Sequence, residues 1–308
     1  MAIGKFPRSK KRVPRAKVDV TTRNVEAMTR RMESAVQLGF AQGIGRFKNN
    51  VAKIDLDRAF NARGYNGLME TIPWADLPGH MGKVAAALDE GMQGAHEHVI
   101  QSVRKVRPEY RQDGGNPRLG PRIKARQRQF MQDLDAETRT HIQTVAQRAA
   151  RTGASSAQVA QEIKDGLGLN QRQQRALLNY RKNLTADAQA GKRAYRGIDG
   201  LVDSYAQRLL QARAKTIAIT ESRQAAAGAQ LAAWGAMMGD GVVEPHAHKR
   251  WVLGWPNACP EICYPMAGKE VRVDQPWKLP NGKLAMVPND AHPNCRCYMS
   301  LETDDGDS

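Results

Sequence analysis

The chain has 308 residues and a hydrophobic content of 41%, enough for a sizeable core and for about two folding units. Its 47 lysines and arginines outnumber 31 aspartates and glutamates, giving a formal net charge of +16, and such a positive field favours polyanions. No run of about 18 apolar residues occurs, and no apolar stretch follows the basic first residues. We therefore expect no membrane span and no secretory signal, and a protein that is soluble and cytoplasmic when made.

The composition also bears on the partner. Binding to a membrane surface would need an amphipathic basic helix with bulky aromatic anchors, whereas aromatic residues make up only 6% of the chain. Nucleic acid is the expected partner, and no membrane partner is expected.

Residues 1–18 are predicted to form a disordered basic arm. Pro7 and Pro14 discourage a helix there, and the first 17 residues contain no acid. Lysine and arginine side chains neutralise DNA phosphates without reading sequence. The candidate nucleic-acid-binding residues of the arm are Lys5, Arg8, Lys10, Lys11, Arg12, Arg15 and Lys17.

Residues 19–106 are predicted to be an N-terminal helical region. Apolar residues from Val25 to Phe40 recur at steps of three or four, which places them on one helical face. The tract 61–79 is rich in glycine and proline and is predicted to be a connector. A second helix is predicted over 81–106, ending before Pro108.

Residues 107–121 are predicted to be a loop or linker, because prolines and glycines there leave no apolar face. A central helical region follows over 122–238, with Ser155 or Ser156 and Asn170 as caps of two short helices and a long helix over 201–238. Its start is basic, so it supplies a second set of nucleic-acid-binding candidates, with a solvated charged face as the alternative. This set is Arg122, Lys124, Arg126 and Arg128.

After Gly239 the composition changes, and 239–302 is predicted to be a small Cys-rich β module, with 303–308 as a solvated acidic tail. The stretches KRWVLGW, KEVRVD and KLAMVP are typical of short strands. The fold class is therefore mainly α, with a multi-helix body and a C-terminal β module. A module of this size needs a metal or disulfides to supplement its core.

All four cysteines lie in this module. Cys259 and Cys263 form one close pair, Cys295 and Cys297 form another, and His292 stands beside the second. Two short-spaced pairs about 30 residues apart can close a loop on one ion, and thiolates with imidazole suit tetrahedral zinc. The sequence therefore predicts a structural zinc site.

The spacing offers five candidate ligands for four places. One set has all four thiolates; another has Cys259, Cys263 and His292 with one of Cys295 or Cys297. Residues two apart on an extended strand share a face, which favours the four-thiolate set. Two disulfides or unmodified buried thiols remain alternatives. A catalytic cysteine is disfavoured, because Cys295 and Cys297 crowd one another as ligands would.

Several motifs resemble those of one known family. They are AITESRQAAAGAQLAAW, KRWVLGW, CPEIC, AGKEVRV and HPNCRC, preceded by SSAQVAQEIKDGLGLNQRQQRALLNYRKNL. Over roughly residues 140–300 the chain resembles the phage Mu protein F-like minor head proteins, also described as phage head morphogenesis proteins. Two departures are a C-x3-C first pair, where C-x2-C is more usual, and Ile219, where an arginine commonly sits.

The resemblance implies a minor structural protein of a tailed-phage head with no enzymatic role. It implies head morphogenesis, association with the portal protein or the major capsid protein, and location in the virion, in the head interior or at the portal vertex, after assembly in the host cytoplasm. Double-stranded DNA, bound without sequence preference, fits the charge of such a protein.

Two other functions remain open. A metal-dependent nuclease or hydrolase carried in the virion would use His246, His248, His292 and Glu221, but these residues have no known ligand spacing. A DNA-binding regulator would use the cysteine module as a zinc finger, but prolines interrupt the segment between the cysteine pairs, where a recognition helix would be needed.

Overall fold

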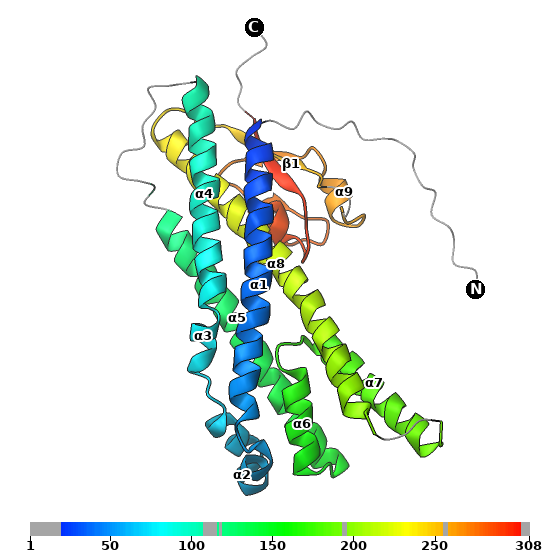
Figure 1. The fold of residues 1–308 in the computed structure, drawn as a ribbon. Coiled ribbons are helices and arrows are strands. Elements are labelled where there is room, and N and C mark those ends of the chain that lie inside the picture. The colour runs from blue at the N-terminus through cyan, green and yellow to red at the C-terminus, as the bar shows by residue number, and fades with distance from the viewer. Residues whose placement is uncertain (1–19, 107–115, 117–118, 193–195, 255–257, 303–308) are drawn as a thin grey trace, which may run out of the picture.

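The computed structural model describes residues 20–106, 116, 119–192, 196–254 and 258–302. The predicted basic arm and the acidic tail lie outside these residues, as does most of the predicted linker. Among the described elements, helices dominate and short strands follow at the C-terminal end (Figure 1), so the predicted fold class is confirmed. No described helix is both long and apolar enough to cross a membrane.

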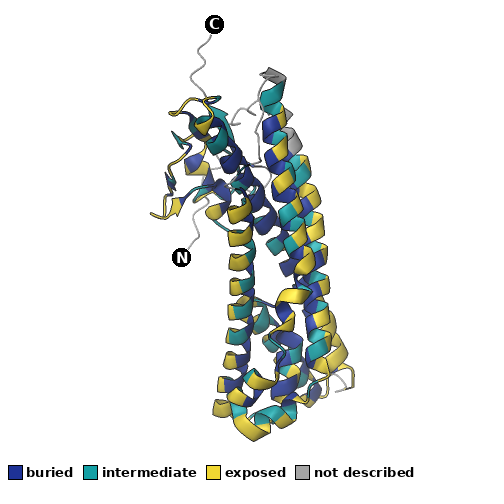
Figure 2. Ribbon diagram, turned by 90° about the vertical axis from the view of Figure 1, so that its left-hand side faces the viewer, coloured by how far each residue is buried: buried dark blue, intermediate teal, exposed yellow. Residues whose placement is uncertain are grey.

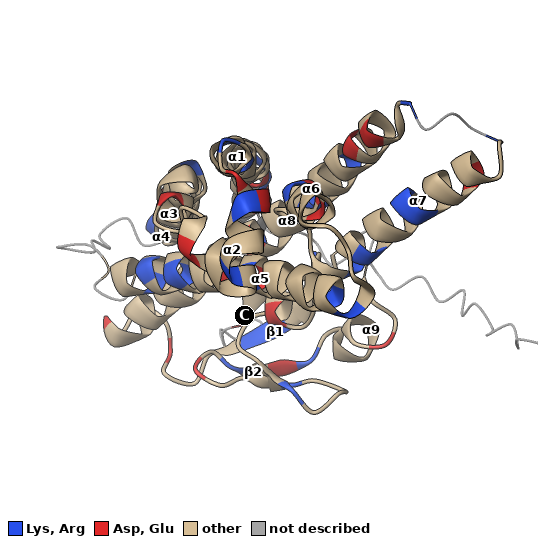
Figure 3. Cartoon of the chain, turned by 90° about the horizontal axis from the view of Figure 1, so that it is seen from below, with Lys and Arg blue, Asp and Glu red and all other residues tan. Residues whose placement is uncertain are grey.

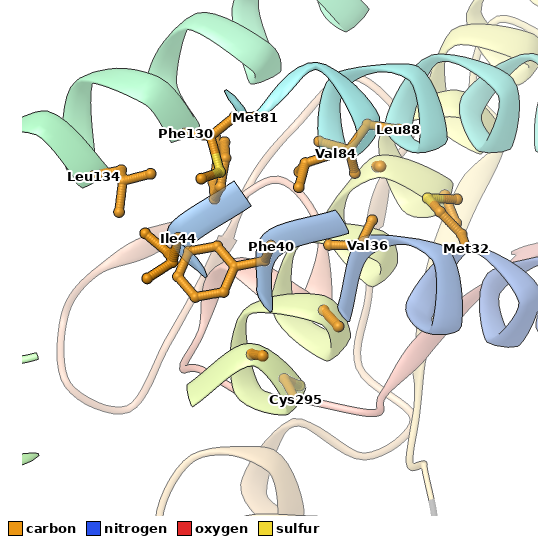
Figure 4. Packing of buried hydrophobic residues seen from close by; sticks show 14 of the residues in the cluster. Met32, Val36, Phe40, Ile44, Met81, Val84, Leu88, Phe130, Leu134 and Cys295 are labelled. Atoms are coloured by element: carbon orange, nitrogen blue, oxygen red, sulfur yellow. The ribbon is translucent and has the colours of Figure 1, made fainter. Parts of the chain in front are cut away.

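The centre of the body is a bundle of three long helices, α1 (Val20–Ala52), α4 (Gly82–Val106) and α8 (Ile198–Gly239), each packed against the other two. The predicted apolar stripe of α1 is buried, from Val25 to Phe40, and continues to Val51. Figure 4 shows this stripe facing Met81, Val84 and Leu88 across the α1/α4 interface. Burial of this stripe is what selects the helix, since isolated helices are marginal in water.

Four further helices extend the body. They are α2 (Leu56–Thr71), α5 (Leu119–Thr152), α6 (Ser156–Gly166) and α7 (Gln171–Gln189). Ser155 and Asn170 cap α6 and α7, which confirms the predicted caps and decides for Ser155 over Ser156; both caps form capping boxes. The rings of Phe130 on α5 and Phe40 on α1 pack edge to face at a centroid distance of 6.4 Å, which ties α5 to the central bundle.

The prediction of a connector over 61–79 is wrong. Most of it is helical, in α2 and the short α3 (Asp76–His80). Gly64, with φ of 57° and ψ of −136°, lies outside the helical region and with Arg63 interrupts α2 at a kink between two helical segments. Gly67 lies so close to the carbonyl of Ala59 that a Cβ would be 2.1 Å from its oxygen. These glycines therefore serve a kinked helix, and Pro73 follows its end.

Two helix starts also differ from prediction. α5 begins at Leu119, three residues before the predicted start, because Pro121 fits within a first helical turn. α8 begins at Ile198 after Gly197, whose φ of 93° is accessible to glycine. The predicted helix over 81–106 is confirmed within the described residues, where α4 spans Gly82–Val106.

The C-terminal module contains a three-stranded antiparallel sheet in the order β2-β1-β5 and a two-stranded hairpin. The sheet strands are β1 (His248–Val252), β2 (Glu270–Arg272) and β5 (Tyr298–Glu302). The hairpin pairs β3 (Trp277–Lys278) with β4 (Leu284–Ala285). The helix α9 (Cys263–Met266) and a 3-10 turn, η1 (Pro288–Asp290), complete it. Sequence reasoning missed β3 and β5.

The module packs against the C-terminal half of α8. In that half, helices of the body cover one side and the module covers another, so almost every residue from Ala218 to Trp234 is buried or half-buried (Figure 2). The run of alanines in this half of α8 follows from its position, because small side chains allow neighbouring elements to approach the helix closely on several sides.

Candidate metal centre

Three of the four cysteines are brought together in the module. Cys263 starts α9, and Cys295 and Cys297 lie in the segment before β5; all three side chains are almost fully buried. His292 lies in the same segment as the second pair. The cysteine pairs are therefore close in space, as the sequence predicts.

The donor atoms of Cys263, His292 and Cys295 all lie within 4.8 Å of one another and could hold a metal ion. The Cys263 Sγ is 3.0 Å from His292 Nε2 and 3.9 Å from Cys295 Sγ. Tetrahedral zinc with bonds of about 2.3 Å to sulfur separates two sulfurs by about 3.8 Å. The spacing of the two sulfurs fits such a centre.

The ring of His292 is oriented for this role. Its Nδ1 is 2.8 Å from the carbonyl oxygen of Pro293, so Nδ1 carries the proton that it donates to that carbonyl. The Nε2 lone pair is then free toward Cys263. A second hydrogen bond that fixes the tautomer is typical of histidine metal ligands.

Cys297 adjoins the three-residue group. The neighbouring side chains of Cys263 and Cys295 lower the pKa of the Cys297 thiol, and the backbone of Gly254 acts in the same direction. The pKa of Cys295 is raised, first by its contacts with Cys263 and Cys297 and then by burial. Several donors thus stabilise negative charge on the Cys297 sulfur, as expected for a metal-binding thiolate.

The segment that carries these ligands is fixed by buried hydrogen bonds. The side-chain amide of Asn289 donates to the carbonyls of Cys295 and Cys297 at 2.8 and 3.2 Å. Asn294 has a φ of 61°, a left-handed conformation that asparagine tolerates. Gly254 passes so close that a Cβ would be 1.7 Å from the carbonyl oxygen of Arg296. Larger residues are excluded there.

Helix α8 provides the platform for the segment. Thr220 Oγ1 accepts from the Asn294 backbone N–H at 3.1 Å, Arg223 donates to the Arg296 carbonyl at 3.4 Å, and Gln224 donates to the Asn289 carbonyl at 3.2 Å. These helix residues are three and four positions apart and so share one face. The TESRQ sequence of α8 and the HPNCRC sequence therefore form one structural unit.

Arg223 also joins this unit to the helical body. Its side chain is 5% exposed and pairs with Glu26 and Glu33 of α1 at 2.8 and 3.0 Å. Burial lowers the pKa of Arg223, but its bonds to the two carboxylates raise it overall, so the guanidinium stays charged. A buried arginine of this kind needs both carboxylates to offset desolvation.

Neither predicted ligand set is the group that the structure assembles. The thiol of Cys259 is half-buried and lies 3.1 Å from a carboxylate oxygen of Glu261, outside the three-residue group. His292 joins the group. The contact that sets Cys259 apart is local, because its thiol lies against the Glu261 carboxylate in the turn before α9. The spacing alone could not decide whether Cys259 reaches the metal, because a C-x3-C pair can bind one ion with both cysteines or turn only one of them inward.

The residues of the enzyme alternative are not gathered. Glu221 is paired with Arg126 of α5 at 2.5 Å, and burial raises its pKa. His246, His248 and Glu221 belong to no metal-ligand group among the described residues. The regulator alternative has no recognition helix in the described module, because α9 spans only four residues, CYPM, and carries no basic side chain.

Of the candidate nucleic-acid-binding residues, one set lies outside the described residues and the other set lies on α5. Those of the arm, Lys5 to Lys17, lie outside the described residues. In α5, Arg122, Lys124 and Arg128 are exposed, whereas Arg126 is half-buried in its ion pair with Glu221. Lys124 also lines a cavity of about 480 Å³ against α4. Steps of two residues place neighbours on different helix faces, so these four do not form one patch.

Sequence reasoning missed the residues that support the site. Asn289, Thr220 and Gly254 touch the ligand-bearing segment only because the chain folds back on α8. Lys249 was missed too: it is fully buried, its Nζ donates to the Met286 carbonyl at 2.9 Å, and it lies 4.7 Å from the centre of the Trp277 ring. The strand KRWVLGW gave no signal that its lysine would point inward.

Comparisons with known proteins give no match: no family model, no curated protein and no solved structure is similar to this chain.

Proposed function

We propose that this protein is a minor structural protein of a tailed-phage head, with a zinc-stapled module that docks on a helical body. The observation that carries the proposal is the meeting of two motifs distant in sequence. The helix motif around Thr220 and Arg223 holds the segment from His292 to Cys297 through direct hydrogen bonds. Both motifs belong to the resemblance with the Mu F-like minor head proteins.

Zinc, when bound, supplies cross-links between α9 and the segment before β5. Cys263, His292 and Cys295 would hold it, and the adjoining Cys297 is the candidate fourth ligand. Four protein ligands would close the coordination sphere, which is typical of structural and not of catalytic zinc. The site therefore fixes the shape of the module, and the function is structural.

The metal part of the proposal is tested on purified full-length protein. Elemental analysis should give about one zinc per chain in the unaltered protein and in the matched variant Cys259→Ser, and a clear loss in Cys263→Ser. A zinc content below half an equivalent in the unaltered protein, with no change of fold on chelation, would refute it.

The head role is tested in a phage whose genome encodes this chain. The protein should co-sediment with DNA-filled heads at low copy, and deletion of its gene should reduce infectious particles while portal and capsid proteins are still made. Normal titre and absence of the protein from purified heads would refute the role. A metal-dependent cleavage of DNA that is lost in His248→Ala and Glu221→Ala would instead favour the virion enzyme.

A further inference from the structure

Helix α7 and the N-terminal part of α8 form a helical pair that extends from the body. Figure 3 shows α7 and the adjoining part of α8 running outward together. Their contact is direct: the side chain of Gln173 donates to the Leu209 carbonyl at 2.8 Å, and the rings of Tyr180 and Tyr205 lie 4.7 Å apart. Leu177, Leu184 and nearby apolar residues bury the inner face. The outer face is left to solvent.

That outer face of α7 is basic. Arg172, Arg175 and Lys182 are exposed and stand at steps of three and seven residues, which places them on one side of the helix. None of the three takes part in an ion pair among the described residues. The one carboxylate of α7, Asp187, lies beyond this stripe toward the C-terminal end.

Two carboxylates near α7, Asp165 and Asp199, bind an arginine on another face of the helix. Arg181, on the neighbouring face of α7, binds Asp165 at 2.7 Å and Asp199 at 2.6 Å. Burial lowers the pKa of Lys48 on α1, and the charges of Asp165 and Asp203 partly offset that effect. These carboxylates therefore neutralise inward cations and leave the outer stripe of α7 unopposed.

The neighbouring surface of α8 is also basic. Arg208 and Lys215 are exposed, and no acid occurs between Ser204 and Thr220. The guanidinium of Arg208 lies over the Tyr205 ring at 5.5 Å from its centre, beside the ring contact with Tyr180. The two half-buried tyrosines therefore lie at the contact between α7 and α8, with Arg208 beside them.

The length of this basic stripe is close to the width of the major groove of DNA. Arg172 and Lys182 are ten residues apart, about 15 Å along a helix, and the major groove of duplex DNA is about 12 Å wide. One end of the stripe can reach phosphates on one rim while the other end reaches the opposite rim. Single strands are better served by exposed stacking rings, whereas Tyr180 and Tyr205 are already packed on each other.

We infer that the outer face of α7, formed by Arg172, Arg175 and Lys182 and continued by Arg208 and Lys215 of α8, binds the phosphate backbone of duplex DNA without sequence preference. This inference rests on the proposed function for the identity of the polyanion, and it supplies a surface that sequence reasoning did not identify. The sequence placed DNA contacts at 122–128, where Arg126 is instead paired with Glu221.

The test compares two triple variants of the full-length chain. R172Q/R175Q/K182Q removes the stripe, and R46Q/K53Q/R58Q removes the same number of exposed positive charges from α1, α2 and the turn between them. Glutamine keeps helix propensity close to that of lysine and arginine, so both variants should retain the helical circular dichroism of the unaltered protein. Fluorescence anisotropy with several 30-base-pair duplexes then gives the dissociation constant across a range of salt concentrations.

Each phosphate contact contributes about 0.9 to the slope of log affinity against log salt. The stripe variant should lose about 2 to 3 from this slope on every duplex, and the control variant less than one. Equal losses in the two variants would overturn the α7 surface while leaving DNA binding in place. If the unaltered protein binds no duplex, or binds vesicles of anionic lipid but no duplex, both this surface and the DNA contact of the proposed function are overturned.

Discussion

The helical body and the C-terminal module are stabilised in different ways. The body buries continuous apolar stripes, such as the one from Val25 to Val51 on α1, against long neighbours. The module has few apolar residues, and its buried groups include Lys249, Asn289, three thiols and the edge-to-face pair Trp251 and Trp277. The body is therefore tolerant of single polar changes, whereas the module depends on a few specific contacts.

The largest expected effect is unfolding of the C-terminal module while the helical body stays folded. Cys263→Ser should abolish metal binding and unfold the module, because the binding free energy of a structural zinc is part of the folding free energy. The helices of the body should keep their circular dichroism, and the near-ultraviolet signal of the tryptophans should fall. Cys259→Ser is the matched control and should behave as the unaltered protein. Loss of the helical signal in Cys263→Ser would show that the regions are not separate in stability.

The second largest effect on stability is expected at the joint between body and module, which is the buried ion-pair group of Arg223 with Glu26 and Glu33. Arg223→Met leaves Glu26 and Glu33 without their buried cation and should cost about 3 to 5 kcal/mol of unfolding free energy. Urea denaturation measures this, with Arg31→Met, an exposed arginine of α1, as the control within about 0.5 kcal/mol of the unaltered protein. A cost below about 1 kcal/mol would mean that α1 does not depend on the joint.

Within the module, Lys249 should make stability depend on pH. Burial lowers the pKa of Lys249 to about 8 from an ordinary 10.5, so between these values the unfolded chain binds more protons than the folded one. Unfolding free energy should therefore rise with pH over this window, by up to about 3 kcal/mol at 1.36 kcal/mol per pKa unit.

In Lys249→Met this rise should be absent. Urea unfolding followed by tryptophan fluorescence at pH 7 to 10 measures the difference between the two proteins, which removes the titration of other groups. An identical pH dependence in both would contradict a buried charged amine at this position, and Lys278→Met, an exposed lysine of the module, serves as the control.

The smallest effect belongs to the body. Ser155→Ala removes the capping box of α6 and should cost about 1 kcal/mol. Thermal unfolding checks this, with Ser204→Ala on the exposed face of α8 as the control. A loss above 3 kcal/mol would indicate that the body, like the module, depends on single polar contacts.

Much of the body could be predicted because its signals are local. The 3.6-residue stripe of α1 and the caps Ser155 and Asn170 act within a few residues of the helix that they specify. The failure at 61–79 concerns Gly67. Gly64 does interrupt α2, but Gly67 lies inside the second helical segment, where the carbonyl of Ala59 across the kink leaves no room for a Cβ.

The sequence by itself determined that the cysteines would gather and that His292 was a candidate beside them, because short spacings constrain chain geometry. Only the tertiary structure decided that Cys259 stands apart, that Thr220 and Arg223 hold the ligand segment, and that Arg126 is paired inward while Arg172 and Lys182 face outward. Those outcomes depend on which helix faces meet, and that is fixed by burial of the whole core.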